Sequence, residues 1–438
     1  MVRPLVSLAF LSAFITDSAV AQTNPLDPTP TLSGYITRVS SPSDFDVNGV
    51  HVIVNGKTQL QRATDAQSSS TNVEDVFFGE CTDIYGKLDR KQHRVEATKV
   101  VFCRFDSEAL SGVAIIDHLI EPAIDKDLVV RADGYPIRIE PSTAVAYVAP
   151  LSSLNDIKPN IWIEYHGTLS SNGTILADKV LFRPNNISEK EGELRRKNEY
   201  DPSTVPPNSE QSAISKHFLG MDPKKIPPYD DPAMQSRVDR IGASLIPSYQ
   251  RHLKSDEPSR ISFRFQLIDN PKLNDALTLP NGIILVPRQI VERLENDSQL
   301  ATVLADNIAT ALEKQRYRLD PAYKTTNLAM EMASVGGAFV PGLGLAGVIA
   351  KHVSDTSIKT DLIQQSGRVS LGLLRDAGYD LEQAPVAWWL LAAKPSKSMK
   401  DTQIPSRALN LYRAIGLIWT NYPTTASPAN NAVTSSTN

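Results

Sequence analysis

The stretch Leu300–Gln315, LATVLADNIATALEKQ, predicts a helix, because its apolar residues recur every three or four positions and so share one buried face. Those residues are Leu300, Val303, Leu304, Ile308, Ala311 and Leu312. Three residues of types that commonly begin a helix precede the run, namely Asn296, Asp297 and Ser298. On this helix Asp306 and Thr310 lie one turn apart and face the same way, with Asn307 beside them. We therefore expect these polar residues to gather at one point of the helix.

Three further segments accompany this helix in the sequence. A strand-like run with an LPNG turn, DALTLPNGIILVP, occupies residues 275–287. QSGRVSLGLLRDAGYDLEQAP follows at residues 365–385, and DTQIPSRALNLYRAI at residues 401–415. Together they resemble the zinc metallopeptidase family of the CAAX prenyl protease and HtpX. In that family an LPGG-like turn precedes an HExxH helix, and an EADRxG-like motif before AGYDP and a THPSxxERI stretch come later. The resemblance implies a zincin-like domain over residues 232–422.

The same resemblance indicates which catalytic groups this chain lacks. Asp306, Asn307 and Thr310 stand where the family has the first His, the Glu and the second His. Counting back from AGYD places Gln365 at the third zinc ligand, which is a Glu in the family. Zinc prefers thiolate, imidazole and carboxylate ligands, and only Asp306 offers one of these. We therefore expect no zinc cofactor, no activated water and no general base.

A pseudoenzyme is the function that this pattern favours. Three alternatives stay open: a hard cation bound through Asp306 and neighbouring oxygens, an active metalloendopeptidase with an unconventional metal site, and a purely structural module in which neither groove nor barrel binds anything specific. Arg407 matches the Arg of the late family stretch, where it is expected to cap or brace the groove.

In the resembled family, the strand after the LPGG-like turn presents an unpaired edge to the peptide. The corresponding residues here are Leu279, Pro280, Asn281, Gly282, Ile283 and Ile284. An extended peptide could add to such an edge through main-chain hydrogen bonds, which need no catalytic residue. An equally open alternative is that the strand belongs to the core and that its edges are covered.

Residues 33–184 contain an internal repeat. The first copy, residues 33–106, opens with SGYITRV and closes with ATKVVF. The second copy, residues 107–184, contains SGVAIID near its start and closes with ADKVLF. Short β-branched runs between Asn-Gly and Asp-Gly turns are typical of hairpins in a small barrel. The copies resemble small β-barrel repeats of unknown function in exported bacterial proteins, and predict two OB-like binding or spacer modules.

The N-terminus has the features of a secretory signal: Arg3, an apolar run, and an Ala-Val-Ala site before Gln22. Residues 1–21 are therefore predicted to be a signal peptide, and the protein to be periplasmic or extracellular. Cys81 and Cys103 are the only two cysteines. An oxidising compartment favours a disulfide between them, with two buried free thiols as the alternative.

Three segments differ in composition from the domains. Residues 185–231 are rich in proline and alternating charge, which predicts a linker. Residues 423–438 are rich in small polar residues and are predicted to be a disordered tail. Leu328–Ala350 is apolar and rich in glycine, which favours a buried helical hairpin with peripheral membrane contact as a second role.

The composition is that of a globular protein, with 41% hydrophobic residues and a net charge of −4. This charge gives no electrostatic attraction to nucleic acid. The sequence thus predicts an α+β multidomain protein, in which two tandem small antiparallel β-barrels precede a mainly helical zincin-like domain with a small β-sheet. Its expected role is a peptide- or protein-binding scaffold in the cell envelope, and the sequence leaves the oligomeric state undefined.

Overall fold

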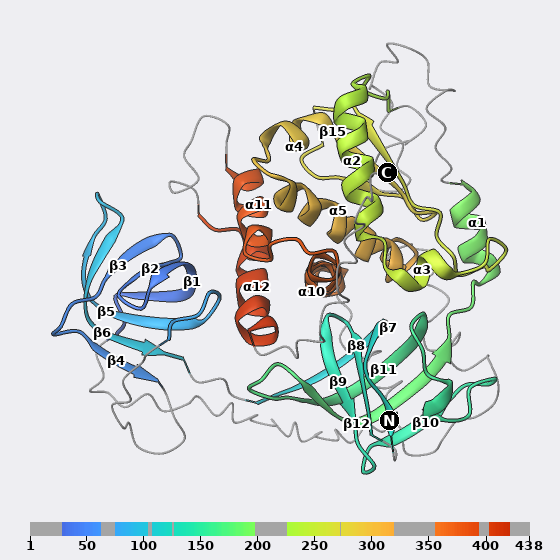
Figure 1. The fold of residues 1–438 in the computed structure, drawn as a ribbon, viewed down its shortest axis with the longest axis horizontal. Helices are drawn as coiled ribbons and strands as arrows, with labels where there is room; N and C mark the ends of the chain where they lie inside the picture. The colour runs from blue at the N-terminus through green and yellow to red at the C-terminus, as the bar shows by residue number, and fades with distance from the viewer. Residues whose placement is uncertain are drawn as a thin grey trace, which may run out of the picture.

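The computed structural model describes residues 29–62, 75–103, 107–124, 127–197, 226–271, 273–318, 355–393 and 403–420. They form two closed five-stranded β-barrels followed by a helical region with a small sheet (Figure 1), which confirms the predicted succession. The predicted signal peptide 1–21, the run Leu328–Ala350 and the tail 423–438 lie outside the described residues. None of the described helices is both long and apolar enough to cross a bilayer.

The first barrel closes through a parallel pair of strands. Its members are β1 (Leu32–Ser41), β2 (Asp44–Val47), β3 (Val50–Ile53), β5 (Cys81–Asp89) and β6 (Arg94–Phe102). They follow one another around the barrel as β1-β2-β3-β6-β5, and only the β3–β6 pair is parallel. The short β4 (Gln59–Arg62) adds to β6. The β2–β3 hairpin turns at Asn48 and Gly49, whose positive φ angles of 48° and 75° suit the predicted Asn-Gly turn.

The second barrel repeats this topology. Its members are β7 (Glu108–Ile124), β8 (Asp127–Ala132), β9 (Tyr135–Ile139), β11 (Ile161–Leu169) and β12 (Ile175–Pro184). The order is β7-β8-β9-β12-β11, with β9 and β12 parallel, and β10 (Ala144–Tyr147) adds to β12. Asp133 and Gly134 form the equivalent turn, with φ angles of 55° and 75°. A short 3-10 helix, Leu154–Asp156, precedes β11.

Gly86 in β5 and Gly167 in β11 occupy equivalent positions in the two barrels. Each lies at a β-bulge in the pairing with the following strand. A Cβ atom would lie 2.1 Å from the Glu96 carbonyl oxygen at Gly86, and 2.3 Å from the Leu176 carbonyl oxygen at Gly167. The close approach of backbone at each bulge therefore requires glycine, which gives the repeated residue a physical reason.

Outside the barrels, the described residues form helices and a three-stranded sheet. The helices are α1 (Glu189–Lys197), α2 (Pro232–Leu245), α3 (Ser248–His252), α4 (Arg288–Arg293), α5 (Asp297–Leu312), α6 (Gln315–Arg318), α10 (Asp355–Asp376), α11 (Gln383–Ala392) and α12 (Ser406–Ala414), the last continued by a π-helical turn at Ile415–Trp419. The strands are β13 (Arg264–Ile268), β14 (Leu277–Thr278) and β15 (Ile283–Pro287). β15 is central, parallel to β13 and antiparallel to β14.

The helix predicted from the opening stretch is α5, and the Asn296 side chain caps it by accepting a hydrogen bond from the Gln299 N–H at 2.9 Å. The expectation of a single buried face is wrong. Thirteen of its residues are buried, because α2, α10, α11 and β14 pack around it. Asp306 and Asn307 are therefore 3% and 4% exposed, and their polar groups must find partners inside the protein.

The predicted linker 185–231 begins with ordered structure. Its residues 189–197 form α1, and Glu191 on this helix is 3% exposed. The Lys314 ammonium lies 2.9 Å from the Glu191 carboxylate, and it also donates to the Asn186 carbonyl at 3.0 Å. This buried ion pair corrects the linker prediction at its start: composition suggested little to bury, but the pairing of opposite charges makes burial possible.

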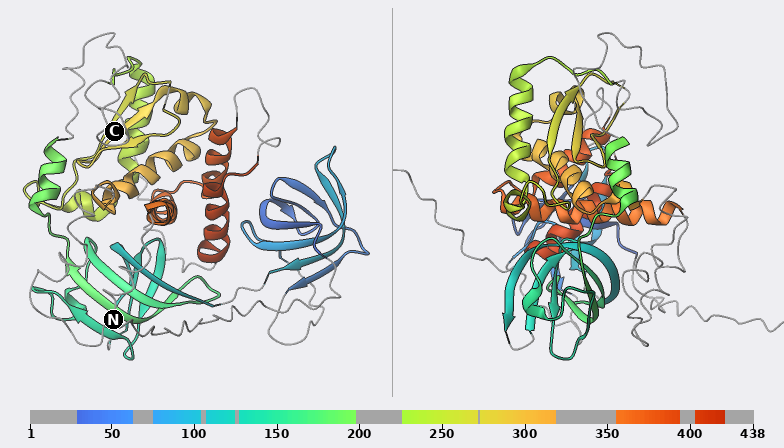
Figure 2. Two further views of the ribbon diagram at one scale, coloured as in Figure 1. Left: turned by 180° about the vertical axis from the view of Figure 1, so that it is seen from behind. Right: turned by 90° about the vertical axis from the view of Figure 1, so that its right-hand side faces the viewer.

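Barrel 2 is joined to the helical region by buried polar contacts. Gln365 of α10 donates from Nε2 to the Val113 carbonyl of β7 at 3.0 Å. The Ile115 N–H, also on β7, donates to the carboxylate of Glu313 at 3.2 Å. Figure 2 shows from two directions that this barrel lies directly against the helices. Barrel 2 therefore packs directly against the helical region.

Barrel 1 meets the helical region through close backbone packing. Gly79, with a φ of +80°, lies so near the α12 backbone that a Cβ atom would be 2.2 Å from the Tyr412 carbonyl oxygen. The rings of Phe78 and Tyr412 are 5.2 Å apart, and the ring of Trp389 of α11 covers Gly49. Figure 1 accordingly shows α11 and α12 between barrel 1 and the remaining helices.

Cys81 and Cys103 form the predicted disulfide across the β5–β6 pair, with their Cα atoms 5.3 Å apart and a sequence separation of 22. Replacing both by alanine should lower the free energy of unfolding by about 3 kcal/mol, since the unfolded chain is then no longer held in a closed loop of that size and gains conformational entropy. Chemical denaturation of the wild type with and without reductant provides the comparison. A double variant as stable as the oxidised wild type would contradict this expectation.

Glu313, which lies between barrel 2 and the helices, should make the stability of the protein depend on pH. It is 1% exposed, and burial raises the pKa of its carboxyl well above the ordinary value, although Arg318 and the Ile115 N–H lower it. The folded protein therefore holds a proton that the unfolded chain releases above about pH 4.5. Stability is full below that pH and falls as pH rises toward the folded pKa, by about 1.4 kcal/mol per unit of raised pKa.

Glu313→Gln should remove the loss of stability at high pH, because the glutamine side chain does not ionise. We expect its melting temperature to equal that of the wild type near pH 4.5 and to exceed it at pH 8, as measured by thermal denaturation across that range. The exposed Glu295→Gln serves as the matched control and should follow the wild type at both pH values. A Glu313→Gln variant that loses stability with pH as steeply as the wild type would show that the carboxyl ionises freely.

Candidate functional site

The candidate site is a charged cluster around the buried Asp306 of α5. One carboxylate oxygen of Asp306 accepts a hydrogen bond from the Ser366 hydroxyl of α10 at 3.0 Å. The other accepts from a guanidinium nitrogen of Arg407, at the start of α12. The second terminal nitrogen of Arg407 donates to Asp275 at 2.7 Å. Three elements distant in sequence therefore meet at one guanidinium, which bridges two carboxylates.

An aromatic ring covers the other side of this guanidinium. The central carbon of Arg407 lies 3.2 Å from the ring centroid of Trp388 in α11, an arrangement that favours a cation over the π-face. Burial lowers the pKa of Arg407, but the Asp306 and Asp275 carboxylates outweigh this effect and raise it. Arg407 is therefore a permanent positive charge in the cluster.

For Asp306, the effect of burial on the pKa prevails over that of its partners. Burial raises the pKa of its carboxyl, and nearby Asp275 raises it further, while Arg407 and the Ser366 hydroxyl lower it. The ion pair thus compensates only part of what it costs to remove a carboxylate from water. A buried carboxylate of this kind depends on its cation partner.

Asn307 and Thr310, which stand at the predicted degenerate positions, are engaged in local hydrogen bonds. The side-chain amide of Asn307 donates to the Val303 carbonyl at 2.9 Å, and its oxygen accepts from the Thr278 hydroxyl of β14 at 2.6 Å. Thr310 donates to the Asp306 carbonyl at 3.0 Å. Asn307 therefore ties α5 to the small sheet, and neither residue supplies a base.

Gln365, the residue counted as the third ligand position, directs its hydrogen bonds toward barrel 2 and α6. Its amide nitrogen binds the Val113 carbonyl, and its oxygen accepts from Arg318 at 2.9 Å. The neighbouring residue Ser366 is the one that contacts Asp306. The structure thus joins Asp306 to Ser366, Arg407 and Asp275. Of these three, the sequence drew attention to Arg407 and, at the start of the LPNG stretch, to Asp275, and a count shifted by one residue would have found Ser366.

Of the predicted peptide-binding residues, Ile283 and Ile284 lie in the central strand β15, and residues 279–282 form the connection between β14 and β15. β15 pairs with β13 on one side and β14 on the other, and all of its residues are buried. The Leu279 N–H donates a hydrogen bond to the Ile283 carbonyl at 2.8 Å, and Gly282, with a φ of +89°, lies in the turn between them. The expectation of an unpaired edge at Ile283 and Ile284 is therefore corrected in favour of a core strand, because β14 folds back to cover that edge.

Within the described ranges, no group of three or more His, Cys, Asp and Glu side chains is placed to hold a metal ion. Asp275 and Asp306 both contact Arg407. The guanidinium stands between them, where a cation would have to bind. A metal could use this pair only if Arg407 moved away.

One protein family matches part of the chain. Residues 33–99 match a family described as a domain of unknown function, DUF5666, a match that covers most of barrel 1. No curated protein matches the sequence. Nothing in these comparisons supports the resemblance of residues 232–422 to zinc metallopeptidases, so that resemblance stays a hypothesis.

Arg407→Ala should destabilise the protein by about 3–5 kcal/mol, because it leaves the buried carboxylate of Asp306 without its cation. Adding Asp306→Asn should recover part of this loss, since the uncompensated charge disappears. Both effects can be measured by chemical denaturation at pH 7.

Arg413→Ala is the matched control for this cycle. Arg413 lies on the same helix, and it and its partner Glu108 are each 50% exposed, so the change should cost about 1 kcal/mol or less. If Arg407→Ala proved as mild as Arg413→Ala, the cluster would contribute nothing to stability.

Proposed function

We propose that this protein is an exported, metal-free relative of zinc metallopeptidases that acts as a protein-binding scaffold in the cell envelope. The observation that carries the proposal is the engagement of Asp306 by Arg407 and Ser366. Asp306 is the only residue among the four motif positions with a zinc-binding side chain, and its two oxygens already have partners. The positive charge at this point is a guanidinium, which cannot activate water.

The base required for peptide hydrolysis is also unavailable at the expected position. Asn307 has an amide, which does not accept a proton at neutral pH, and its oxygen and nitrogen both have hydrogen-bond partners. Gln365 fastens barrel 2 to the helices. Residues at the former catalytic positions thus have structural tasks that fit a scaffold better than an enzyme.

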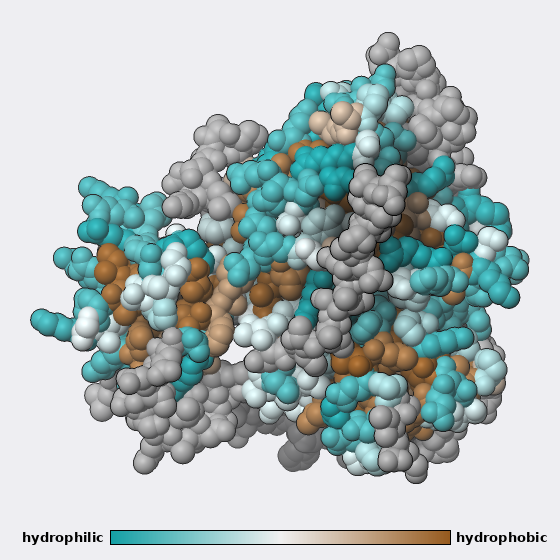
Figure 3. Space-filling model, viewed as in Figure 1, coloured by the Kyte–Doolittle hydropathy of each residue, from teal (hydrophilic) through white to brown (hydrophobic). Residues whose placement is uncertain are grey.

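The barrels supply the surfaces that a scaffold needs. Their strand order, with the first, second, third, fifth and fourth strands in succession and a parallel closing pair, is the order we associate with OB-like barrels. Figure 3 shows apolar residues gathered over both barrels, and Phe77 of barrel 1 is 41% exposed. The net charge of −4 argues against nucleic acid as the ligand, so we favour protein.

Metal analysis of the purified protein tests this function. We expect far less than one zinc per chain, and no proteolytic activity that a chelator abolishes. Stoichiometric zinc with chelator-sensitive proteolysis would instead establish the alternative, an active metalloendopeptidase with an unconventional site.

Restoring the family's ligands tests the relationship itself. A variant with Asp306→His, Asn307→Glu and Thr310→His, together with either Gln365→Glu or Ser366→Glu, should bind zinc only when Arg407→Ala is added, because the guanidinium otherwise stands in the site. Isothermal titration with zinc gives the measurement, and the same variants with Arg407 retained are the control. Folded variants that ignore zinc in every combination would refute the proposed ancestry.

A further inference from the structure

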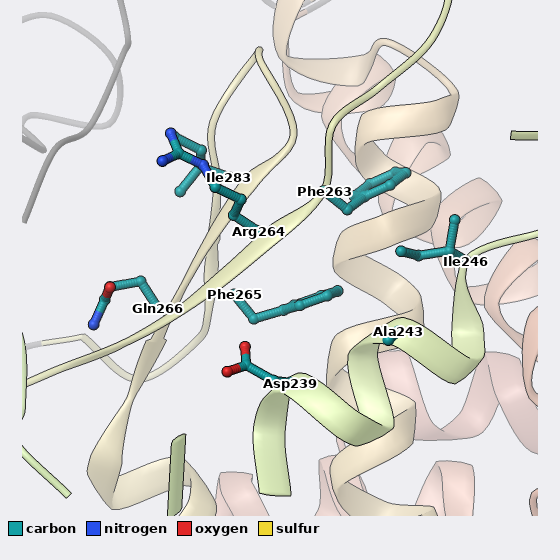
Figure 4. A pocket seen from close by; sticks show the side chains of 8 residues that line it. All are labelled: Asp239, Ala243, Ile246, Phe263, Arg264, Phe265, Gln266 and Ile283. Atoms are coloured by element: carbon teal, nitrogen blue, oxygen red, sulfur yellow. The ribbon is translucent and has the colours of Figure 1, made fainter. Parts of the chain in front are cut away.

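A groove of about 380 Å³ runs between α2 and the outer edge of β13 (Figure 4). Asp239, Ala243 and Ile246 form its helix side, and Phe263 and Phe265 project from the strand side. Arg264 and Gln266 of β13 and Ile283 of β15 complete its lining. None of these lining residues belongs to the Asp306 cluster, and β15 lies between β13 and β14 in the sheet. The groove is therefore separate from the candidate site described above.

The outer edge of β13 is already paired over part of its length. The Tyr229 N–H donates to the Leu267 carbonyl at 3.0 Å, and the Asp269 N–H donates to the Pro227 carbonyl at 3.1 Å. Pro228 and Ile268 form an antiparallel bridge between these two bonds. Residues 227–229 thus act as a short partner strand at the C-terminal end of β13.

A side chain continues this pairing. The Gln235 amide nitrogen donates to the Phe265 carbonyl at 2.8 Å, and its oxygen accepts from the Leu267 N–H at 2.9 Å. These are the two bonds that the backbone of a neighbouring strand would form with β13. The Gln235 amide therefore occupies the place of one peptide group in a partner strand.

Beyond Gln235 the edge opens into the groove. Alternation along a strand places the Phe265 N–H and the Phe263 carbonyl on the same outer side as the groups that Gln235 binds. Neither forms a hydrogen bond with any residue that the structure describes. Gly242 allows the Phe265 ring to lie against α2, since a Cβ there would be 2.4 Å from the ring. The backbone edge and the aromatic wall are thus presented together.

We propose that an extended segment of a partner protein, carrying alternating apolar and basic residues, adds to the outer edge of β13 in this groove. Its backbone would continue the partner strand that residues 227–229 and Gln235 begin. Apolar side chains would pack on Ile246 and Phe263, and a lysine or arginine would pair with Asp239. The inference rests on the proposed scaffold function and names the chemistry of its partner.

Charge complementarity supports the basic residue. Asp239 is an exposed carboxylate on the groove wall, and it accepts a hydrogen bond from the neutral Gln235 amide at 3.0 Å. Partial burial raises the pKa of Asp239, because it removes some of the water that stabilises the negative charge. A cation placed beside the carboxylate would compensate for that loss. The chain itself reaches this edge at the opposite end, next to Asp269, and then turns into α2, which leaves the groove end for another chain.

Fluorescence anisotropy with three labelled nine-residue peptides tests the proposal on the full protein. The first peptide alternates valine with lysine and threonine, the second replaces lysine by glutamate, and the third is the first with alternate amides methylated. The lysine peptide should bind, and the other two should bind about tenfold more weakly or less, because one lacks the charge and the other the main-chain donors.

Two variants locate the binding. Ala243→Trp fills the groove from an exposed position of α2 and should weaken the lysine peptide about tenfold, while Ala233→Trp, exposed at the start of the same helix, should leave it unchanged. Asp239→Asn should weaken the lysine peptide and leave the weak glutamate peptide unaffected. Circular dichroism shows whether each variant remains folded.

Three outcomes would overturn the groove as the peptide site: binding that ignores Ala243→Trp, equal binding of the methylated peptide, or no binding of the lysine peptide. These outcomes are distinct from failure of the scaffold function, which the zinc measurements decide. A metal-free protein that fails the peptide assay would keep the proposed scaffold role and lose only this surface.

Discussion

A buried carboxylate needs a cation, and much of the helical region is arranged to provide one for Asp306. α5 is enclosed by α2, α10, α11 and β14, so the carboxylate cannot reach water. Arg407 reaches it from α12, Trp388 of α11 covers the guanidinium, and Ser366 of α10 satisfies the remaining oxygen. A single charge thus fixes the relative positions of four helices, because each contact depends on the others being in place.

Buried polar side chains also hold barrel 2 against the helices. Gln365 and Glu313 use side-chain groups to bind main-chain atoms of β7, and Lys314 pairs with Glu191 of α1 close by. Each of these groups is buried, so each hydrogen bond prevents a larger desolvation loss. The result is a barrel and a helical region that keep separate hydrophobic cores but are joined by buried polar contacts.

Under the proposed function, the replacement of catalytic residues by structural ones would explain how a peptidase-like frame persisted without chemistry. Asn307 joins α5 to β14, Gln365 joins α10 to barrel 2, and Asp306 joins α5 to α12. In each case the residue at a motif position now holds two elements together. Under the proposed function, selection for a firm scaffold would preserve these residues, since losing any one leaves a buried group unpaired.

The sequence by itself determined the local features: the two barrels with their Asn-Gly and Asp-Gly turns, the disulfide, the α5 helix with its Asn296 cap, and the succession of strands and helices around it. These follow from periodicity and turn chemistry, which act over a few residues. The partners of Asp306 and Gln365 were decided only by the tertiary structure. They lie 101 and 252 residues away, at Arg407 and Val113, and such pairs depend on how whole elements pack. The sequence also could not predict that β14 covers one edge of β15 or that β13 keeps an open edge. Strand order is a long-range property that no local pattern encodes.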